Sequence, residues 1–462
     1  MAECNLVNFD VTIQGEKPPY NLHVAYQGYT ATGYFDQEIT QDAWQPLQRA
    51  LERSAYLPDA SAIVAAGSRL YQALFKERVR DLWITARADL EQERVDGLRL
   101  RLALHPPTVA ALPWESLYDP DRNTPFAAGS GTALVRVEPL YAYVGPARRL
   151  RVSLPVKVLV AVPDDPDNLL DPDKEIAGIR QVQEAIGGDT IRIHELRGRF
   201  SVVQMRQALH ELRADVLHFV GHGTAEGLQF WQHDRPMSTP AASLRVTMGR
   251  VRSVKFAFLN ACLAGRGVGL APFSSIGAQL LQAGLPAVIA MQYPIRDDAA
   301  IDFAHFFYEE LLCGPCPGAI DLAVDAARSS LYALNPGDIS FGTPMLWLNA
   351  QDGRVFIPNG GREAALPGHA SGETTPLDLA AESIWLDEMA ATDLNGLPAA
   401  YSFVLDKWQN LLDELRHLLH QLDALAAQMD TVAYAAKVVE YKRYKAALLR
   451  LQRLLHEATG QA

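Results

Sequence analysis

A histidine and a cysteine each follow an apolar run and lie among small residues, and together they could perform nucleophilic catalysis. His222 lies between two glycines after the apolar run 216–220. Cys262 follows the apolar run 256–260. A cysteine becomes a nucleophile when a nearby base raises its thiolate fraction, and backbone N–H groups stabilise the oxyanion that forms on an attacked carbonyl. We therefore assign Cys262 as candidate nucleophile, His222 as proton acceptor and donor, and the N–H groups of Gly223 and Cys262 as a candidate oxyanion hole.

The surrounding pattern predicts that both residues lie at the carboxyl ends of parallel strands. From residue 154 on, short β-rich runs alternate with helical stretches, which is typical of βαβ units. Functional groups of such sheets gather at the carboxyl ends of the strands, and a crossover between successive strands lets an imidazole and a thiol face one another. The flanking glycines predict that His222 lies in an exposed turn. A buried thiol and an ordinary turn histidine are the alternative, but their joint position favours the catalytic pair.

The pattern predicts an open α/β domain at 151–355, with helices on both faces of a parallel sheet. Its strands are expected at 156–162, 190–194, 216–220, 256–260 and 287–291, with a closing strand at 345–348. Its helices are expected at 174–186, 202–213, 240–250, 275–283, 299–312 and 319–333. Residues 1–150 predict an α+β region with strands at 5–11, 22–26, 98–104 and 132–137 and helices at 42–55 and 60–81.

Four segments resemble the CHAT family of caspase-like cysteine peptidases, which are relatives of separase. They are 215–223, 259–262 with Gly265, 274–295 with Asp297, and the upstream run 112–119, which contains Leu-Pro-Trp-Glu-Ser. The resemblance covers roughly residues 90–350. It implies a caspase-like, doubly wound and mainly parallel α/β fold, and a catalytic dyad of Cys262 and His222 without metal or organic cofactor. It also implies a protein substrate and a role in bacterial signalling or defence.

Substrate preference points to two carboxylates beyond the fifth strand. Separase-like relatives commonly cleave after a basic residue, and a buried Arg or Lys side chain must be paired with a negative charge. Asp297 is the candidate for this pocket, and Asp298 beside it is the alternate. An aspartate at this place could instead cap the helix expected from residue 299.

The end of the chain predicts a linker and a helical tail. Residues 356–400 are rich in Gly and Pro and contain a short helix near 377–391. Residues 401–462 carry apolar side chains at steps of three and four, which predicts a coiled-coil tail formed by one long helix or a helical hairpin. The apolar seam must pack on the body of the protein, on a second copy or on a partner helix.

Composition excludes several classes of protein. The chain has 462 residues, of which 48% are hydrophobic and 21% charged, so it is neither disordered nor fibrous. The net charge of −12 argues against binding to nucleic acid or to anionic membranes. Neither an export signal nor a membrane-spanning run is apparent, and four unevenly spaced cysteines suit a reducing compartment, so we expect a cytoplasmic protein.

Further interpretations remain beside the leading one, a cysteine endopeptidase that an activating protease or a regulatory protein switches on. The runner-up is an inert CHAT-like scaffold that binds partners, although the intact pair of His222 and Cys262 argues against it. A nucleotide-binding module would use the glycine-rich run 265–269, which lacks a complete phosphate-loop motif. His218 within its apolar strand is expected to be a hydrogen-bonded core residue. The lone C-x-x-C at Cys313 and Cys316 is a weak zinc or redox motif.

Overall fold

The computed structural model forms two compact units, Met1–Pro358 and Asn359–Ala462. The residues that it describes are 6–36, 61–92, 94–126, 131–137, 150–167, 170–186, 190–223, 227–263, 272–334, 338–350, 353–356, 379–391, 402–427, 441, 445 and 448. Several predicted segments lie outside this set: the helix at 42–55, the glycine-rich run 265–269 and most of the linker.

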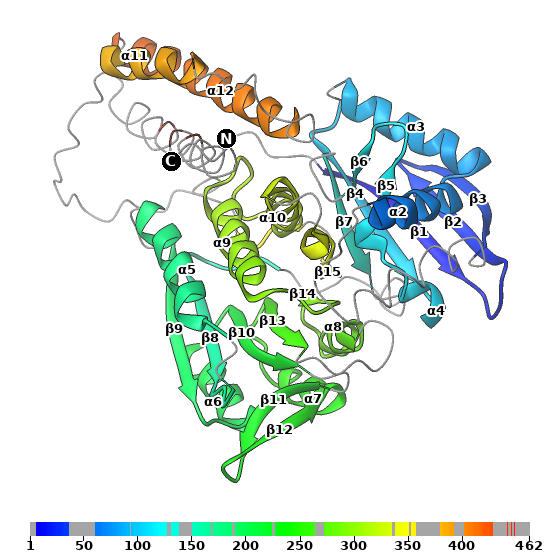
Figure 1. Ribbon diagram of the computed structural model, residues 1–462, viewed down its shortest axis with the longest axis vertical. Helices are drawn as coiled ribbons and strands as arrows, with labels where there is room; N and C mark the ends of the chain where they lie inside the picture. Colours follow the sequence, from blue (N-terminus) through cyan, green and yellow to red (C-terminus); the bar gives the residue numbers. More distant parts are fainter. Residues whose placement is uncertain are drawn as a thin grey trace. The chain divides into compact units, whose positions relative to one another are not determined.

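A single mixed sheet of 13 strands runs through the first unit (Figure 1). Its strands are β1 (Leu6–Gln14), β2 (Tyr20–Tyr26), β3 (Tyr29–Phe35), β4 (Gly97–Leu104), β7 (Thr132–Val137), β8 (Val156–Pro163), β9 (Ile191–Gly198), β10 (Val216–Gly223), β11 (Gly227–Gln232), β12 (Arg235–Pro240), β13 (Phe256–Leu263), β14 (Ala287–Met291) and β15 (Pro344–Leu348). β5 (Tyr118–Asp119) and β6 (Thr124–Pro125) form a separate pair.

The predicted α/β fold is confirmed in the middle of this sheet. Strands β9, β8, β10, β13 and β14 are neighbours in that order and all parallel, and β15 closes the group antiparallel to β14. β8, β10, β13 and β14 consist mostly of buried residues, as in Val156–Pro163, because helices cover both faces, whereas the edge strand β9 is buried only in part. The carboxyl ends of β8, β10, β13 and β14 therefore meet at one edge.

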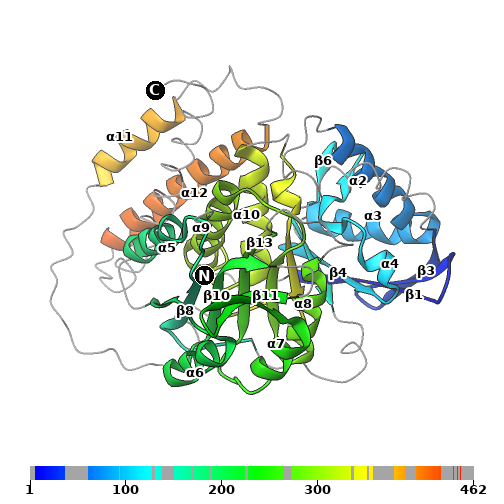
Figure 2. The ribbon, with the colours of Figure 1, turned by 60° about the horizontal axis from the view of Figure 1, so that its bottom comes forward.

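Helices lie in two layers over these strands (Figure 2). One layer contains α5 (Pro172–Ile186), α9 (Asp297–Cys313) and α10 (Ile320–Leu334), which pack side by side. The opposite layer contains α6 (Val202–Leu212), α7 (Ala241–Met248) and α8 (Pro272–Gln282). Ser201 and Gln204 form a capping box at the start of α6, which explains why that helix begins where the pattern predicts.

The α+β region predicted at the start of the chain extends the same sheet. β1, β4 and β7 are parallel neighbours, and β7 pairs with β15. The remaining elements are α2 (Ser61–Leu74), α3 (Glu77–Glu91), α4 (Pro107–Ala110) and the 3-10 helices η1 (Trp114–Ser116) and η2 (Ile339–Gly342). Aromatic rings of Phe75, Trp83 and Phe126 stack in its core. The boundary that we predicted near residue 150 thus lies within one compact unit.

Several predicted elements have different limits in the structure. The helix expected at 60–81 is two helices, α2 and α3. The strands expected to end at Val220 and Asn260 continue to Gly223 and Leu263. The edge strand β3 and the hairpin of β11 and β12 were not predicted, because their short alternation is mixed with polar and turn residues.

The second unit is helical where the structure describes it. It contains α11 (Leu379–Ala390), close to the predicted short helix, and α12 (Ser402–Ala427). Apolar residues of α12 are buried at steps of three and four, namely Trp408, Leu412, Leu415, Leu418 and Leu422. Among the described helices, none combines the length and the apolar character that a membrane span requires.

Candidate active site

His222 and Cys262 lie side by side in the sheet. They are Cα partners in the parallel register of β10 and β13, next to the last residue of each strand. The structure corrects one expectation: His222 is part of the strand and only 9% exposed, rather than in an exposed turn. The glycines that suggested a turn instead continue the strand, and a Cβ at Gly221 would lie 2.9 Å from the ring of Phe219. The side chain of Cys262 lies outside the described set.

Asp165 is the residue of this site that the sequence analysis missed. It follows β8, and its Oδ1 lies 2.9 Å from Nε2 of His222. Backbone N–H groups hold this carboxylate: Asp167 donates to Oδ1 at 3.2 Å and Leu170 donates to Oδ2 at 3.1 Å. A signal existed, because the Asp164–Asp165 pair stands at the carboxyl end of a predicted strand, at the same edge as the other two residues.

The contact with Asp165 determines which nitrogen of His222 can act as a base. A carboxylate accepts hydrogen bonds, so a neutral imidazole carries its proton on Nε2 and donates it to Asp165. Nδ1 then has the lone pair. Nδ1 is buried and has no hydrogen-bond partner among the described residues. The site therefore presents a histidine that Asp165 orients and whose Nδ1 has no hydrogen-bond partner in the described part of the chain.

A buried polar network lies in the same strands behind the site. Nε2 of His218 lies 2.8 Å from Oε1 of Glu175, and its Nδ1 lies 3.0 Å from the hydroxyl of Tyr308. Asn260 donates to Oε2 of Glu175 at 2.8 Å. Burial raises the pKa of Tyr308 well above its usual value, so its hydroxyl keeps the proton that it donates to His218. His218 is fully buried and hydrogen-bonded, as predicted.

Glu175 therefore connects the two strands that contain His222 and Cys262. It belongs to α5 and receives one hydrogen bond from β10 and one from β13. Both donors precede the site residues on their own strands, so this carboxylate bridges the two strands just before the site.

Asp297 and Asp298 begin α9, at the same edge of the sheet. Arg296 binds Asp298 at 2.7 and 2.9 Å, and this contact lowers the pKa of Asp298. Asp297 instead accepts a hydrogen bond from the backbone N–H of Asp171 at 3.3 Å. Burial first, and then nearby carboxylates, raise the pKa of Asp297. Neither is the N-cap, which is Arg296.

Gly223 and the two cysteines of the C-x-x-C motif are the remaining candidate residues. Gly223 is the last residue of β10, beside Leu263 in the register. Cys313 ends α9 and is half-buried, and Cys316 is disulfide-bonded. No cluster of three or more His, Cys, Asp or Glu in the described part of the chain could hold a metal ion.

Solved structures with a similar fold are distant from this chain in sequence. The separase of the Saccharomyces cerevisiae separase–securin complex is 9% identical, with a TM-score of 0.44 over 75% of this chain and 30% of that chain. The Arg specific cysteine proteinase gingipain R is 11% identical, with a TM-score of 0.41 over 61% of this chain and 70% of that chain. The complex of Porphyromonas gingivalis RgpB pro- and mature domains is also 11% identical, with a TM-score of 0.37 over 67% of this chain and 76% of that chain.

The match to a family model agrees with the resemblance described above. A search of curated proteins found no match. The CHAT domain matches residues 64–353, which is more than half of the chain and includes the Leu-Pro-Trp-Glu-Ser run, β10 and β13. The protein belongs to the CHAT domain family.

Proposed function

We propose that this protein is a cysteine endopeptidase in which Cys262 is the nucleophile and His222 is the base. The observation that carries the proposal is the pairing of these two residues in adjacent strands, with Nε2 of His222 bound to Asp165 and Nδ1 free. A free Nδ1 can accept the thiol proton, and the carboxylate stabilises the imidazolium that results.

The reaction would follow the ordinary course of thiol acyl transfer. The thiolate sulfur forms a bond to the carbonyl carbon, and the oxyanion is held by the N–H groups of Gly223 and Cys262. The C–N bond then breaks, and the imidazolium of His222 gives its proton to the leaving amine. Water, deprotonated by the same imidazole, hydrolyses the thioester and regenerates the thiol.

A basic residue before the scissile bond is part of this proposal, with Asp297 as its partner. Asp298 already has a guanidinium partner in Arg296, whereas Asp297 forms no ion pair with a cation in the described part of the chain and accepts the N–H of Asp171. The raised pKa of Asp297 means that its negative charge is poorly compensated. The cation of an arginine or lysine side chain would supply that compensation.

The setting of the activity belongs to the same proposal: a cytoplasmic enzyme of bacterial signalling or defence, controlled by cleavage or by a partner of the helical tail. We expect such control because an intracellular endopeptidase that is always active would degrade proteins of its own cell. Full activity of the intact, isolated chain would contradict this regulatory part.

The test is cleavage of matched fluorogenic peptides with Arg, Lys, Asp or Leu before the scissile bond. Wild type should cleave the Arg and Lys peptides, and Cys262→Ala should cleave none. Asp297→Asn should lose the preference for basic peptides, while Asp298→Asn is the matched control and should keep it. If neither wild type nor Cys262→Ala cleaves any peptide, before or after limited proteolysis, the inert scaffold becomes the better description.

A further inference from the structure

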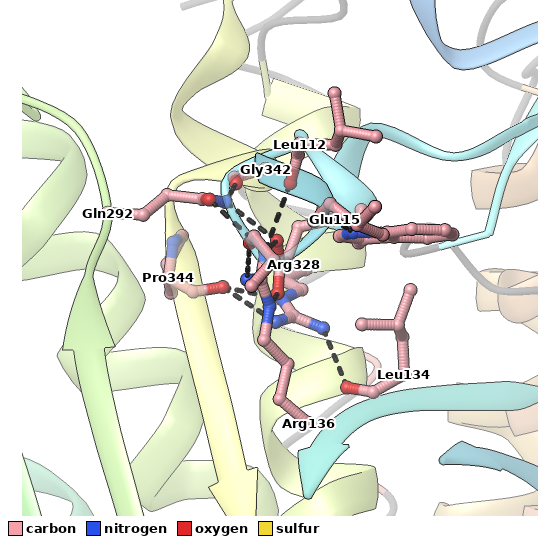
Figure 3. Close-up of polar contacts among 11 residues, drawn as sticks. Leu112, Glu115, Leu134, Arg136, Gln292, Arg328, Gly342 and Pro344 are labelled. Atoms are coloured by element: carbon pink, nitrogen blue, oxygen red, sulfur yellow. Dashed lines mark hydrogen bonds and ion pairs between the residues drawn. The ribbon is translucent and has the colours of Figure 1, made fainter. Parts of the chain in front are cut away.

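The Leu-Pro-Trp-Glu-Ser run forms part of a buried charge network at the junction between the first part of the sheet and the parallel strands (Figure 3). Glu115 lies in η1 and is fully buried, as are Gln292 and Arg328. Arg136 of β7 donates two hydrogen bonds to the carboxylate of Glu115, at 2.8 and 2.6 Å. The two charges form a bidentate pair whose geometry is fixed by the planar groups.

Gln292 connects this ion pair to the segment that leads into α9. Its Nε2 donates to Oε2 of Glu115 at 2.8 Å and to the carbonyl of Gly342 at 2.6 Å. Both hydrogens of the amide are thereby used, and Oε1 faces Arg136 at 3.4 Å. The backbone N–H of Gln292 also donates to Thr343. Gln292 follows directly after β14, so the network fixes the place where the chain leaves the sheet.

The other end of the segment is also held. Arg296 pairs with the buried Asp338 at 3.4 Å, and Asp338 caps η2 through the N–H of Ser340. Asp297 comes directly after this anchor. The segment from Gln292 to Asp297 is thus held at both ends, and its first anchor is the carboxylate of Glu115 in η1.

Buried ion pairs are costly, and apolar residues of similar size often stabilise a fold equally well. Glu115 and Arg136 instead fix an orientation. Glu115 accepts a hydrogen bond from Nε2 of Gln292, and Arg136 donates to Oε1, so both bonds can form only when the amide of Gln292 has one orientation. Arg328 adds a second cation beside the network, donates to the carbonyl of Pro344 at 2.6 and 3.1 Å, and has its pKa lowered by burial.

We propose that Glu115 is a positioning residue for substrate binding, which acts through Gln292 to place the segment 292–298 and with it Asp297. The proposal rests on the proposed function, because it assumes that Asp297 contacts the substrate. It assigns the first part of the chain a role in the reaction: it holds one wall of the substrate site in place.

The test uses the full chain and the variant Gln292→Met, which removes the amide and leaves the ion pair of Glu115 and Arg136 intact. We expect KM for the Arg peptide to rise about three- to tenfold, which is the loss of roughly one hydrogen bond, and any fall in kcat to be smaller than this rise in KM. The second variant, Glu115→Gln, should raise KM in the same way. The control is Tyr26→Phe, which removes another buried hydrogen bond of the first part of the sheet, to Asp89, and should leave KM unchanged.

Amide hydrogen exchange gives a readout that does not depend on activity. In Gln292→Met the amide of residue 292, which donates to Thr343, and the amides of residues 293 and 295–298 should exchange at least about tenfold faster, whereas Tyr26→Phe should leave them unchanged. Unchanged exchange in this segment would overturn the inference whether or not the protein cleaves peptides. Cleavage with an unaltered KM, or a fall in kcat alone, would overturn it and leave the proposed function standing. Absence of any Cys262-dependent cleavage would overturn the proposed function, and the exchange result would still decide whether Glu115 positions the segment.

Discussion

Replacement of Glu175 tests whether hydrogen bonds or charge hold the two strands that contain His222 and Cys262. The carboxylate is 2% exposed and accepts from His218 and Asn260, each at 2.8 Å. In Glu175→Leu both donors lose their acceptor inside the protein. Each buried, unsatisfied donor costs about 1 to 3 kcal/mol, so we expect a loss of about 2 to 6 kcal/mol in the free energy of unfolding.

Glu175→Gln should cost much less, for a reason that lies in His218. The glutamine oxygen can keep the bond from Asn260, and its NH₂ group then faces Nε2 of His218. A neutral histidine can move its proton to Nδ1, so that Nε2 accepts from the amide and Nδ1 donates to the hydroxyl of Tyr308. Both hydrogen bonds of His218 then change direction and neither is lost, so we expect a cost of about 1 kcal/mol.

Urea unfolding of the full chain, followed by far-UV circular dichroism at neutral pH, measures both costs. The matched control is Glu184→Leu, an exposed residue of the same helix, which should change the stability by less than about 0.5 kcal/mol. The ¹⁵N chemical shifts of the His218 ring should report the change of tautomer in Glu175→Gln. Equal losses in the glutamine and leucine variants would refute the reasoning, because the negative charge and not the hydrogen bonding would then hold the strands.

Two further predictions concern the reaction itself. Asp165→Asn should lower kcat about a hundredfold with a small effect on KM, because an amide group turned towards Nε2 would donate to it and place the ring proton on Nδ1; steady-state kinetics on the Arg peptide measure this, and an unchanged kcat would remove Asp165 from the mechanism. The raised pKa of Asp297 predicts that kcat/KM for the Arg peptide falls on acidification at a higher pH than an ordinary aspartate would give, since the cation binds only the ionised carboxylate. Protonation of the thiolate or of His222 lowers kcat/KM for every peptide, so the effect of Asp297 is measured as the ratio of kcat/KM for the Arg peptide to that for the Leu peptide. This ratio should fall on acidification in wild type and stay constant in Asp297→Asn, and a fall that persists in that variant would assign it to another group.

The strands near the site were predictable because apolar residues predominate in each of them. Periodicity placed β14 at its observed limits and β8, β10 and β13 within three residues of theirs. The ends were less certain for a physical reason: Gly221 and Gly223 usually end a strand, yet here the glycine at 221 is required by close packing against Phe219. The burial of His222 follows from this extension and could not be inferred from glycine content alone.

Local sequence patterns could not predict the hydrogen-bond partners of Glu115 and Glu175. The contacts of Glu115 with Arg136 and Gln292 join residues from three distant parts of the chain, and no periodicity links their positions. The same holds for Glu175, which the helical pattern alone marks as an ordinary acidic residue in the first turn of α5. Sequence analysis could identify the reactive residue types and contained a signal for Asp165, whereas the contacts of Glu115 and Glu175 follow only from the three-dimensional structure.

The bonds around Asp165 and Asp297 suggest that base orientation and substrate binding are coupled. Asp165 receives the N–H of Leu170, and Asp297 receives the N–H of the very next residue, Asp171. One short loop therefore joins the carboxylate that orients His222 to the carboxylate that we assign to the substrate. If binding of a basic side chain displaces Asp297, the displacement is transmitted through the N–H of Asp171 to the loop that contains Asp165. Binding of the preferred residue would then align the imidazole, so that the specificity of such a site would appear in kcat as well as in KM.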